Sequence, residues 1–74
     1  MDYRDRFRLL RIAHKLEQED VADLCFVSQQ TVSGWETHRS HMSIDSIIIL
    51  CNYYKVSSDY ILGLPEYPRL DKDK

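Results

Sequence analysis

The chain has 74 residues, enough for one small domain, and a domain of this size buries only about 60% of the surface of its unfolded chain. A roomy catalytic cleft is therefore not expected, and no nucleophile, base and orienting group occur together, which argues against an enzyme. Ten Lys and Arg against twelve Asp and Glu give a formal net charge of −2, which excludes binding to polyanions by bulk charge alone. Two Gly and two Pro are too few for a strand-and-turn fold, so we expect helices.

The first two predicted helices follow from apolar spacing. Tyr3, Phe7 and Leu10 recur every three or four residues, which predicts a helix within the first fifteen residues. A second, short helix is predicted over 18–25, where the apolar positions again share one face. Its first turn is acidic, which suits the positive end of a helix dipole.

Three serines are placed to cap the remaining helices. Ser28, Ser43 and Ser57 each precede a segment with helical spacing, and a serine hydroxyl can accept from a free backbone N–H in the first turn. The predicted helices run over about 29–36, over roughly 44–54, and from the third serine through Leu62. Gly63 is a typical residue for the end of a helix. We expect one domain over 1–64 and a solvated tail over 65–74.

The cysteines and histidines predict neither a disulfide nor a metal site. Cys25 and Cys51 lack a CxxC partner and are expected to be reduced core residues. His38 and His41 have no Cys or carboxylate at the spacing of a zinc finger, so no metal and no cofactor are expected. No apolar run approaches the roughly 20 residues of a membrane span, and we predict a cytoplasmic protein without membrane contact.

Three separated blocks carry a family resemblance. Residues 16–22, 27–36 and 56–63 read LEQEDVA, VSQQTVSGWE and VSSDYILG, and together they resemble the Cro/CI-type helix-turn-helix family, also called the XRE family. The resemblance implies an all-α, compact five-helix bundle of the lambda-repressor-like type, in which helix two and helix three bind DNA. It further implies a sequence-specific, double-stranded DNA-binding transcriptional regulator, of the small repressor type found in phages and bacteria.

Periodicity and family position predict the same core. Its expected members are Phe7, Leu10, Leu16, Val21, Ala22, Cys25, Val27, Val32, Trp35, Ile47, Leu50, Cys51, Val56 and Ile61.

The third helix carries the predicted base-reading residues. Gln29 and Gln30 occupy its first turn, and a Gln amide presents a donor and an acceptor that match adenine in the major groove. Ser33, one turn on, is a further candidate for a base contact. Gly34 is unusual inside a helix, because glycine there costs about 1 kcal/mol relative to alanine. It either lets the helix lie closer to the groove or has no function at an exposed position.

The predicted phosphate contacts lie on both sides of this helix. Gln18 begins the second helix, where free N–H groups favour a phosphate, and the family has a phosphate-contacting Gln at this position. Arg11 and Glu36 occupy the family positions of an Arg–Glu pair beside the DNA backbone. The full set of predicted phosphate contacts is Gln18, Arg11, Arg39, Ser40 and Ser43.

Four residues depart from the family pattern at positions where glycine is common: Lys15, Phe26, His38 and Lys55. Phe26 matters most, because it occupies the turn between the second and third helices. A left-handed backbone is usual in that turn, and a bulky side chain is strained there. This residue puts the shape of the turn and the angle between the two helices in question.

The fourth helix has more apolar side chains than one core face needs. If Ile47, Leu50, Cys51 and Tyr54 face the core, then Ile48, Ile49 and Tyr53 are left on the outside of the helix. An exposed apolar patch of this kind predicts a homodimer interface. A two-fold dimer would read a palindromic operator. The acidic total charge and a third helix without Lys or Arg leave an alternative open, a protein-interaction adaptor or antirepressor that keeps the bundle without productive DNA binding.

Overall fold

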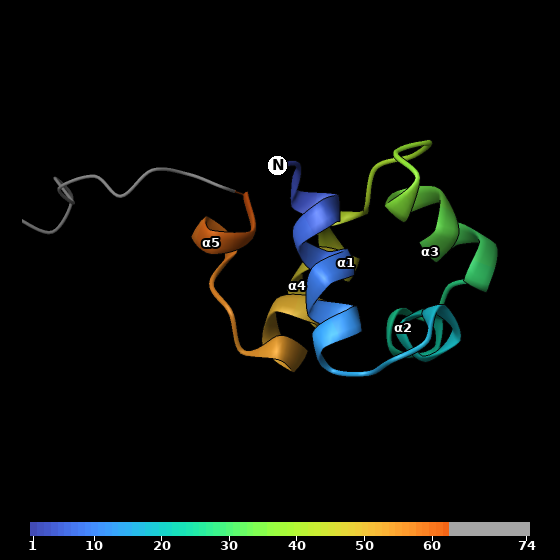
Figure 1. The fold of residues 1–74 in the computed structure, drawn as a ribbon, viewed down its shortest axis with the longest axis horizontal. Helices are drawn as coiled ribbons and strands as arrows, with labels where there is room; N and C mark the ends of the chain where they lie inside the picture. Colours follow the sequence, from blue (N-terminus) through green and yellow to red (C-terminus); the bar gives the residue numbers. More distant parts are fainter. Residues whose placement is uncertain (63–74) are drawn as a thin grey trace, which may run out of the picture.

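The structure, a computed structural model, describes residues 1–62 and contains five helices and no strand in that part of the chain (Figure 1). The helices are α1 (Tyr3–Ala13), α2 (Gln18–Cys25), α3 (Gln29–Glu36), α4 (Ile44–Tyr54) and α5 (Ser58–Leu62). These bounds confirm the five predicted elements. None of the five has both the length and the apolar character needed to cross a membrane. The predicted domain end at residue 64, the cap at Gly63 and the tail over 65–74 lie outside the described residues.

The three predicted serine caps are confirmed. Ser28 Oγ accepts from the backbone N–H of the residue three positions on at 3.1 Å, and Ser43 Oγ and Ser57 Oγ do the same at 3.2 and 3.1 Å. Each hydroxyl therefore satisfies one of the N–H groups that a helix start leaves without a partner. The helix starts are encoded locally, which explains why the sequence predicts them closely.

The helices pack around a single apolar core. α2 packs against α3 and α4, α1 contacts α3 and α5, and α5 closes against α4. The buried apolar residues are Phe7, Val21, Ala22, Cys25, Val32, Trp35, Met42, Leu50, Cys51, Tyr54 and Ile61. The other predicted core residues, Leu10, Leu16, Val27, Ile47 and Val56, are half-buried against this cluster. The core prediction is confirmed, Met42 and Tyr54 are additions to it, and both cysteines are free and buried.

All four residues that replace a common family glycine keep the left-handed backbone. Lys15, Phe26, His38 and Lys55 have φ between 59° and 64°. Phe26 has φ 59° and ψ 43°, and its backbone N–H still donates to the end of α2. The turn between α2 and α3 is therefore retained, with the strain of a left-handed aromatic residue. The side chain is 89% exposed and gains nothing from packing.

One predicted interface residue is placed differently from expectation. Ile49 is half-buried and packs against the core, so the prediction that it lies outside is wrong. The exposed large apolar residues of α4 are Ile44, Ile48 and Tyr53, whose exposed fractions are 69%, 52% and 45%. Ile44 and Ile48 are four residues apart and lie on the same helical face.

Candidate nucleic-acid interface

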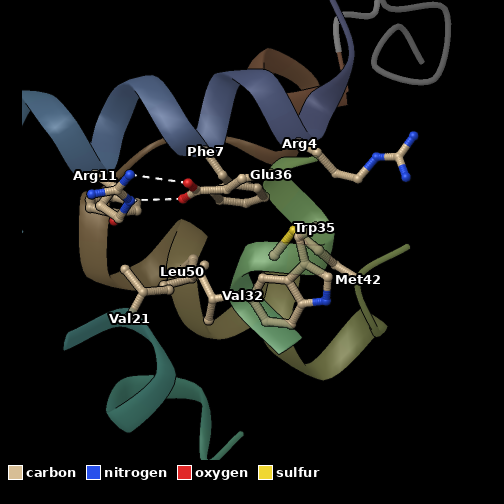
Figure 2. A pocket seen from close by; sticks show the side chains of 10 residues that line it. Arg4, Phe7, Arg11, Val21, Val32, Trp35, Glu36, Met42 and Leu50 are labelled. Carbon is tan, nitrogen blue, oxygen red and sulfur yellow. Dashed lines mark hydrogen bonds and ion pairs between the residues drawn. The ribbon is translucent and has the colours of Figure 1, made fainter. Parts of the chain in front are cut away.

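A largely covered ion pair joins α1 to the end of α3. Arg11 Nε donates to Glu36 Oε2 at 2.7 Å, and a terminal guanidinium nitrogen of Arg11 donates to Glu36 Oε1 at 3.0 Å. Figure 2 shows the two side chains meeting at this contact, and both line a small cavity together with core residues. Their exposed fractions are 14% and 9%, and the third nitrogen of Arg11 donates to the carbonyl of Leu16 at 2.8 Å. The predicted pairing is confirmed, and the role of Arg11 in phosphate contact stays a prediction.

Glu36 is also the start of a hydrogen-bond chain that reaches the first turn of α3. Gln18 Nε2 donates to Glu36 Oε1 at 2.9 Å, and Gln29 Nε2 donates in turn to Gln18 Oε1. Burial raises the pKa of Glu36, but the hydrogen bonds from Arg11 and Gln18 outweigh burial and hold this pKa below its usual value. An ionised Glu36 thus anchors α1, α2 and α3 to one another.

The predicted base-reading residues lie on the first two turns of α3. Gln30 is exposed, Gln29 is half-buried by its contact with Gln18, and Ser33 is half-buried. Gly34 is half-buried as well, so the alternative that it is an exposed position without function is wrong. A Cβ at Gly34 would lie 3.1 Å from Ser40 Oγ, so the glycine lets the following loop pack closely over α3.

The loop between α3 and α4 is fastened to the start of α1. An Arg4 terminal nitrogen donates to the Ser40 carbonyl at 2.9 Å, and the Met42 backbone N–H donates to Tyr3 Oη at 2.9 Å. Arg4 also forms an ion pair with Asp2 at 2.9 Å, and this hydrogen bonding holds the pKa of Asp2 well below its usual range. The sequence reasoning missed this anchor.

The histidines of this loop face α1. His38 Nε2 lies 2.9 Å from Asp5 Oδ1, and His41 Nδ1 lies 3.1 Å from Tyr3 Oη. The hydrogen bond with His38 lowers the pKa of Asp5. Both imidazole rings are therefore part of the loop anchor.

The predicted phosphate contacts fall into two groups. Arg11 and Gln18 both donate to Glu36, and Gln18 also accepts from Gln29, whereas Arg39, Ser40 and Ser43 lie in the segment between α3 and α4. Figure 1 shows that segment following the last turn of α3. Arg39 is exposed, and its Nε donates to the Thr37 hydroxyl at 3.3 Å. Ser43 Oγ accepts from the Ser46 backbone N–H and donates its own hydrogen to Ser46 Oγ at 3.2 Å, so it donates to a phosphate only by giving up that second bond.

An open hollow of about 520 Å³ lies beside Gln18 and Gln29. Arg11, Glu17 and Glu19 complete its lining. The two exposed carboxylates repel an anion, and they make the hollow a poor phosphate site on charge alone. The contact of Gln18 with a phosphate stays a prediction.

The comparison with protein families decides what this arrangement is. A family model described as helix-turn-helix matches residues 7–61. The chain belongs to the helix-turn-helix family. The match confirms the resemblance drawn from the three sequence blocks, and it spans α2, α3 and the connection between them.

Two relatives are similar over most of this chain. The uncharacterized HTH-type transcriptional regulator YobD of Bacillus subtilis (strain 168) is 39% identical over 66 residues, which cover 89% of this chain and 59% of YobD. The HTH-type transcriptional activator BcrR of Enterococcus faecalis is 26% identical over 63 residues, which cover 85% of this chain and 31% of BcrR. The chain thus spans only part of the length of each relative.

Two solved structures share the fold. The P22 c2 repressor, crystallised with synthetic operator 9T in the presence of Tl⁺, superposes with a TM-score of 0.75 at 24% identity, covering 84% of this chain and 94% of that chain. A transcriptional regulator from Listeria innocua gives a TM-score of 0.82 at 22% identity, covering 90% and 63%. These matches confirm the predicted lambda-repressor-like helical fold.

Proposed function

We propose that this chain binds double-stranded DNA in a sequence-specific way and regulates transcription, with α3 in the major groove. The observation that carries the proposal is the first turn of α3, where Gln30 is exposed and Gln29 is held by Gln18. Within a helix-turn-helix, the start of the second helix is the part that approaches base edges. A firmly held amide at that point is suited to reading a base.

The relatives support this proposal through their printed descriptions. YobD and BcrR are described as transcriptional regulators, and the P22 c2 repressor was solved with an operator. Repression, the activity named for the P22 protein, is the mode of regulation that we propose for this chain. The two free, buried cysteines suit a reducing compartment, so a cytoplasmic location belongs to the same proposal.

Salt-dependent binding to duplex DNA tests the proposal. The full chain is titrated with a random duplex at several salt concentrations, and a preferred site is then selected from a duplex pool. We expect affinity to fall as salt rises, because cationic contacts such as Arg39 release counterions from the phosphates. A selected site with clear preference supports sequence-specific reading. Weak binding with a flat salt dependence would instead favour the adaptor or antirepressor alternative.

We also propose that the chain pairs as a homodimer through α4 on a palindromic operator. Ile44 and Ile48 are exposed apolar residues one turn apart on α4, Tyr53 is exposed on another side of the same helix, and exposed apolar patches on small domains commonly mark interfaces. Two-fold pairing would set two copies of α3 about 34 Å apart, one turn of DNA. Ile49 is not part of this proposed interface, because its side chain packs against the core.

Sedimentation at tens of micromolar tests the dimer. The variant Ile48→Asp places a charge on the exposed face of α4, and Leu9→Asp does the same on α1 as a matched control, since Leu9 is similarly exposed. We expect wild type and the Leu9 variant to sediment as dimers and the Ile48 variant as a monomer with weaker operator binding. Monomers in all three cases, with equal DNA affinity, would refute the dimer.

A further inference from the structure

The amide of Gln29 has a defined polarity, because hydrogen bonds connect it to a carboxylate. Glu36 accepts from Gln18, and Gln18 accepts from Gln29. An ionised carboxylate can only accept, so the nitrogen of Gln18 must face Glu36 and its oxygen must face away. That oxygen then requires a donor, which turns the nitrogen of Gln29 toward Gln18.

The hydrogen bonds from Gln29 to Gln18 and from Gln18 to Glu36 form a relay, and Glu36 at its charged end is held firmly. Arg11 donates two hydrogen bonds to Glu36 at 2.7 and 3.0 Å, and Arg8 adds a more distant positive charge at 3.8 Å. The Glu36 side chain lies between α1 and α3 with little exposure to water. Its position and its ionised form are therefore properties of the folded core.

We propose that Glu36 is a positioning residue that makes Gln29 select adenine over guanine. The inference rests on the proposed function of α3. With one N–H engaged by Gln18, Gln29 retains its oxygen and one N–H for a base. Adenine offers a donor at N6 and an acceptor at N7, which this pair matches, whereas guanine offers acceptors at both O6 and N7 and needs two donors.

Reversing the relay would remove the selectivity. If the Gln18 amide turned over, its nitrogen would donate to the oxygen of Gln29 and leave both N–H groups of Gln29 for guanine. Glu36→Gln permits this reversal, because the new amide donates as well as accepts. Gln18→Met removes the relay while leaving the pair of Arg11 and Glu36 intact, so it serves if the first variant fails to fold.

Relative affinity for two duplexes tests the proposal. The selected site is altered from A·T to G·C at the position where Gln29→Ala removes discrimination. The wild type is expected to prefer adenine by about tenfold or more, and Glu36→Gln and Gln18→Met to reduce this preference to about twofold or less. Glu19→Gln is the matched control, because Glu19 is an exposed carboxylate of the same hollow outside the relay, and it should keep the wild-type ratio.

Side-chain amide NMR signals of Gln18 and Gln29 in the DNA-free protein provide a readout independent of DNA. Gln18→Met should shift the Gln29 amide protons, and Glu19→Gln should not. Unchanged Gln29 signals in Gln18→Met, or a wild-type adenine preference in both relay variants that bind DNA, would overturn the role of Glu36. A wild type that binds no duplex would instead overturn the proposed function, and the base preference with it.

Discussion

Arg4 and Arg11 lie two turns apart on α1, and both side chains are largely covered, yet the two ends of the helix hold different parts of the molecule. Arg11 points between the helices and holds Glu36 of α3, whereas the Arg4 guanidinium in Figure 2 points away from the core cavity, toward the loop after α3. The partner of Arg11 is 9% exposed, while Asp2, the partner of Arg4, is much more exposed. The same residue type therefore holds α3 at one end of α1 and a surface loop at the other end.

Arg11→Met should give the largest effect, because it leaves the Glu36 charge buried without its main partner. We expect a loss of about 3 kcal/mol or more in the free energy of unfolding, measured by urea denaturation. The double variant Arg11→Met with Glu36→Leu should recover much of that loss, since it removes the unpaired charge as well. A loss under about 1 kcal/mol in the single variant would show that the pair contributes no more than a surface ion pair.

Acid should weaken the contribution of the Arg11–Glu36 pair to the stability of the fold. The folded-state pKa of Glu36 lies below its ordinary value of 4.5, so this group stabilises the fold above about pH 4.5 and the contribution is lost as pH falls through the folded-state pKa. Denaturation midpoints measured from neutral pH downward should therefore drop in acid, and the drop should be shallower in Arg11→Met. If the midpoint fell equally with pH in both proteins, Glu36 would not be the cause of the acid sensitivity.

Arg4→Met should destabilise the protein clearly less than Arg11→Met, because water can solvate the partly exposed Asp2 carboxylate and the carbonyl of the exposed residue Ser40. Its effect should be local. We expect faster hydrogen exchange at the Met42 backbone N–H, which donates to Tyr3, and unchanged exchange in the centre of α3. Equal acceleration in both places would mean that Arg4 supports the whole bundle.

The smallest predicted change is stabilising and concerns the turn between α2 and α3. Phe26→Gly relieves a left-handed conformation that costs a non-glycine residue about 1–2 kcal/mol, and it sacrifices little burial. The added entropy of an unfolded glycine offsets part of this gain, which leaves about 0.5–1 kcal/mol. Thermal unfolding measures the difference, and a destabilised variant would show that Phe26 makes a contact that stabilises the fold.

The sequence predicts local features well and the loop anchor poorly. The serine caps and the apolar spacing depend on residues within one or two turns, so the five helices are visible in the chain itself. The pairing of Arg11 with Glu36 became predictable only through the family resemblance. The contacts of Arg4 and Tyr3 with the loop join residues more than 35 positions apart, and no local pattern encodes such a return.

Two residues show where helical periodicity reaches its limit. Ile48 and Ile49 are adjacent apolar residues on α4, and spacing alone placed both outside. The packing of α4 against α2 and α5 decides that Ile49 turns inward, which is a tertiary effect. Phe26 shows the same limit for the backbone, because the turn imposes a left-handed conformation that its residue type disfavours.

The most direct test of the account is the binding of Gln30→Ala to two DNAs. Gln30 is exposed at the start of α3 and takes no part in the relay from Glu36, so the substitution should leave the fold intact. Equilibrium titrations with the selected duplex and with a random duplex of equal length should show a loss of about 1–3 kcal/mol on the selected site and almost none on the random one. An equal loss on both duplexes, or no loss on either, would contradict the claim that α3 reads DNA sequence.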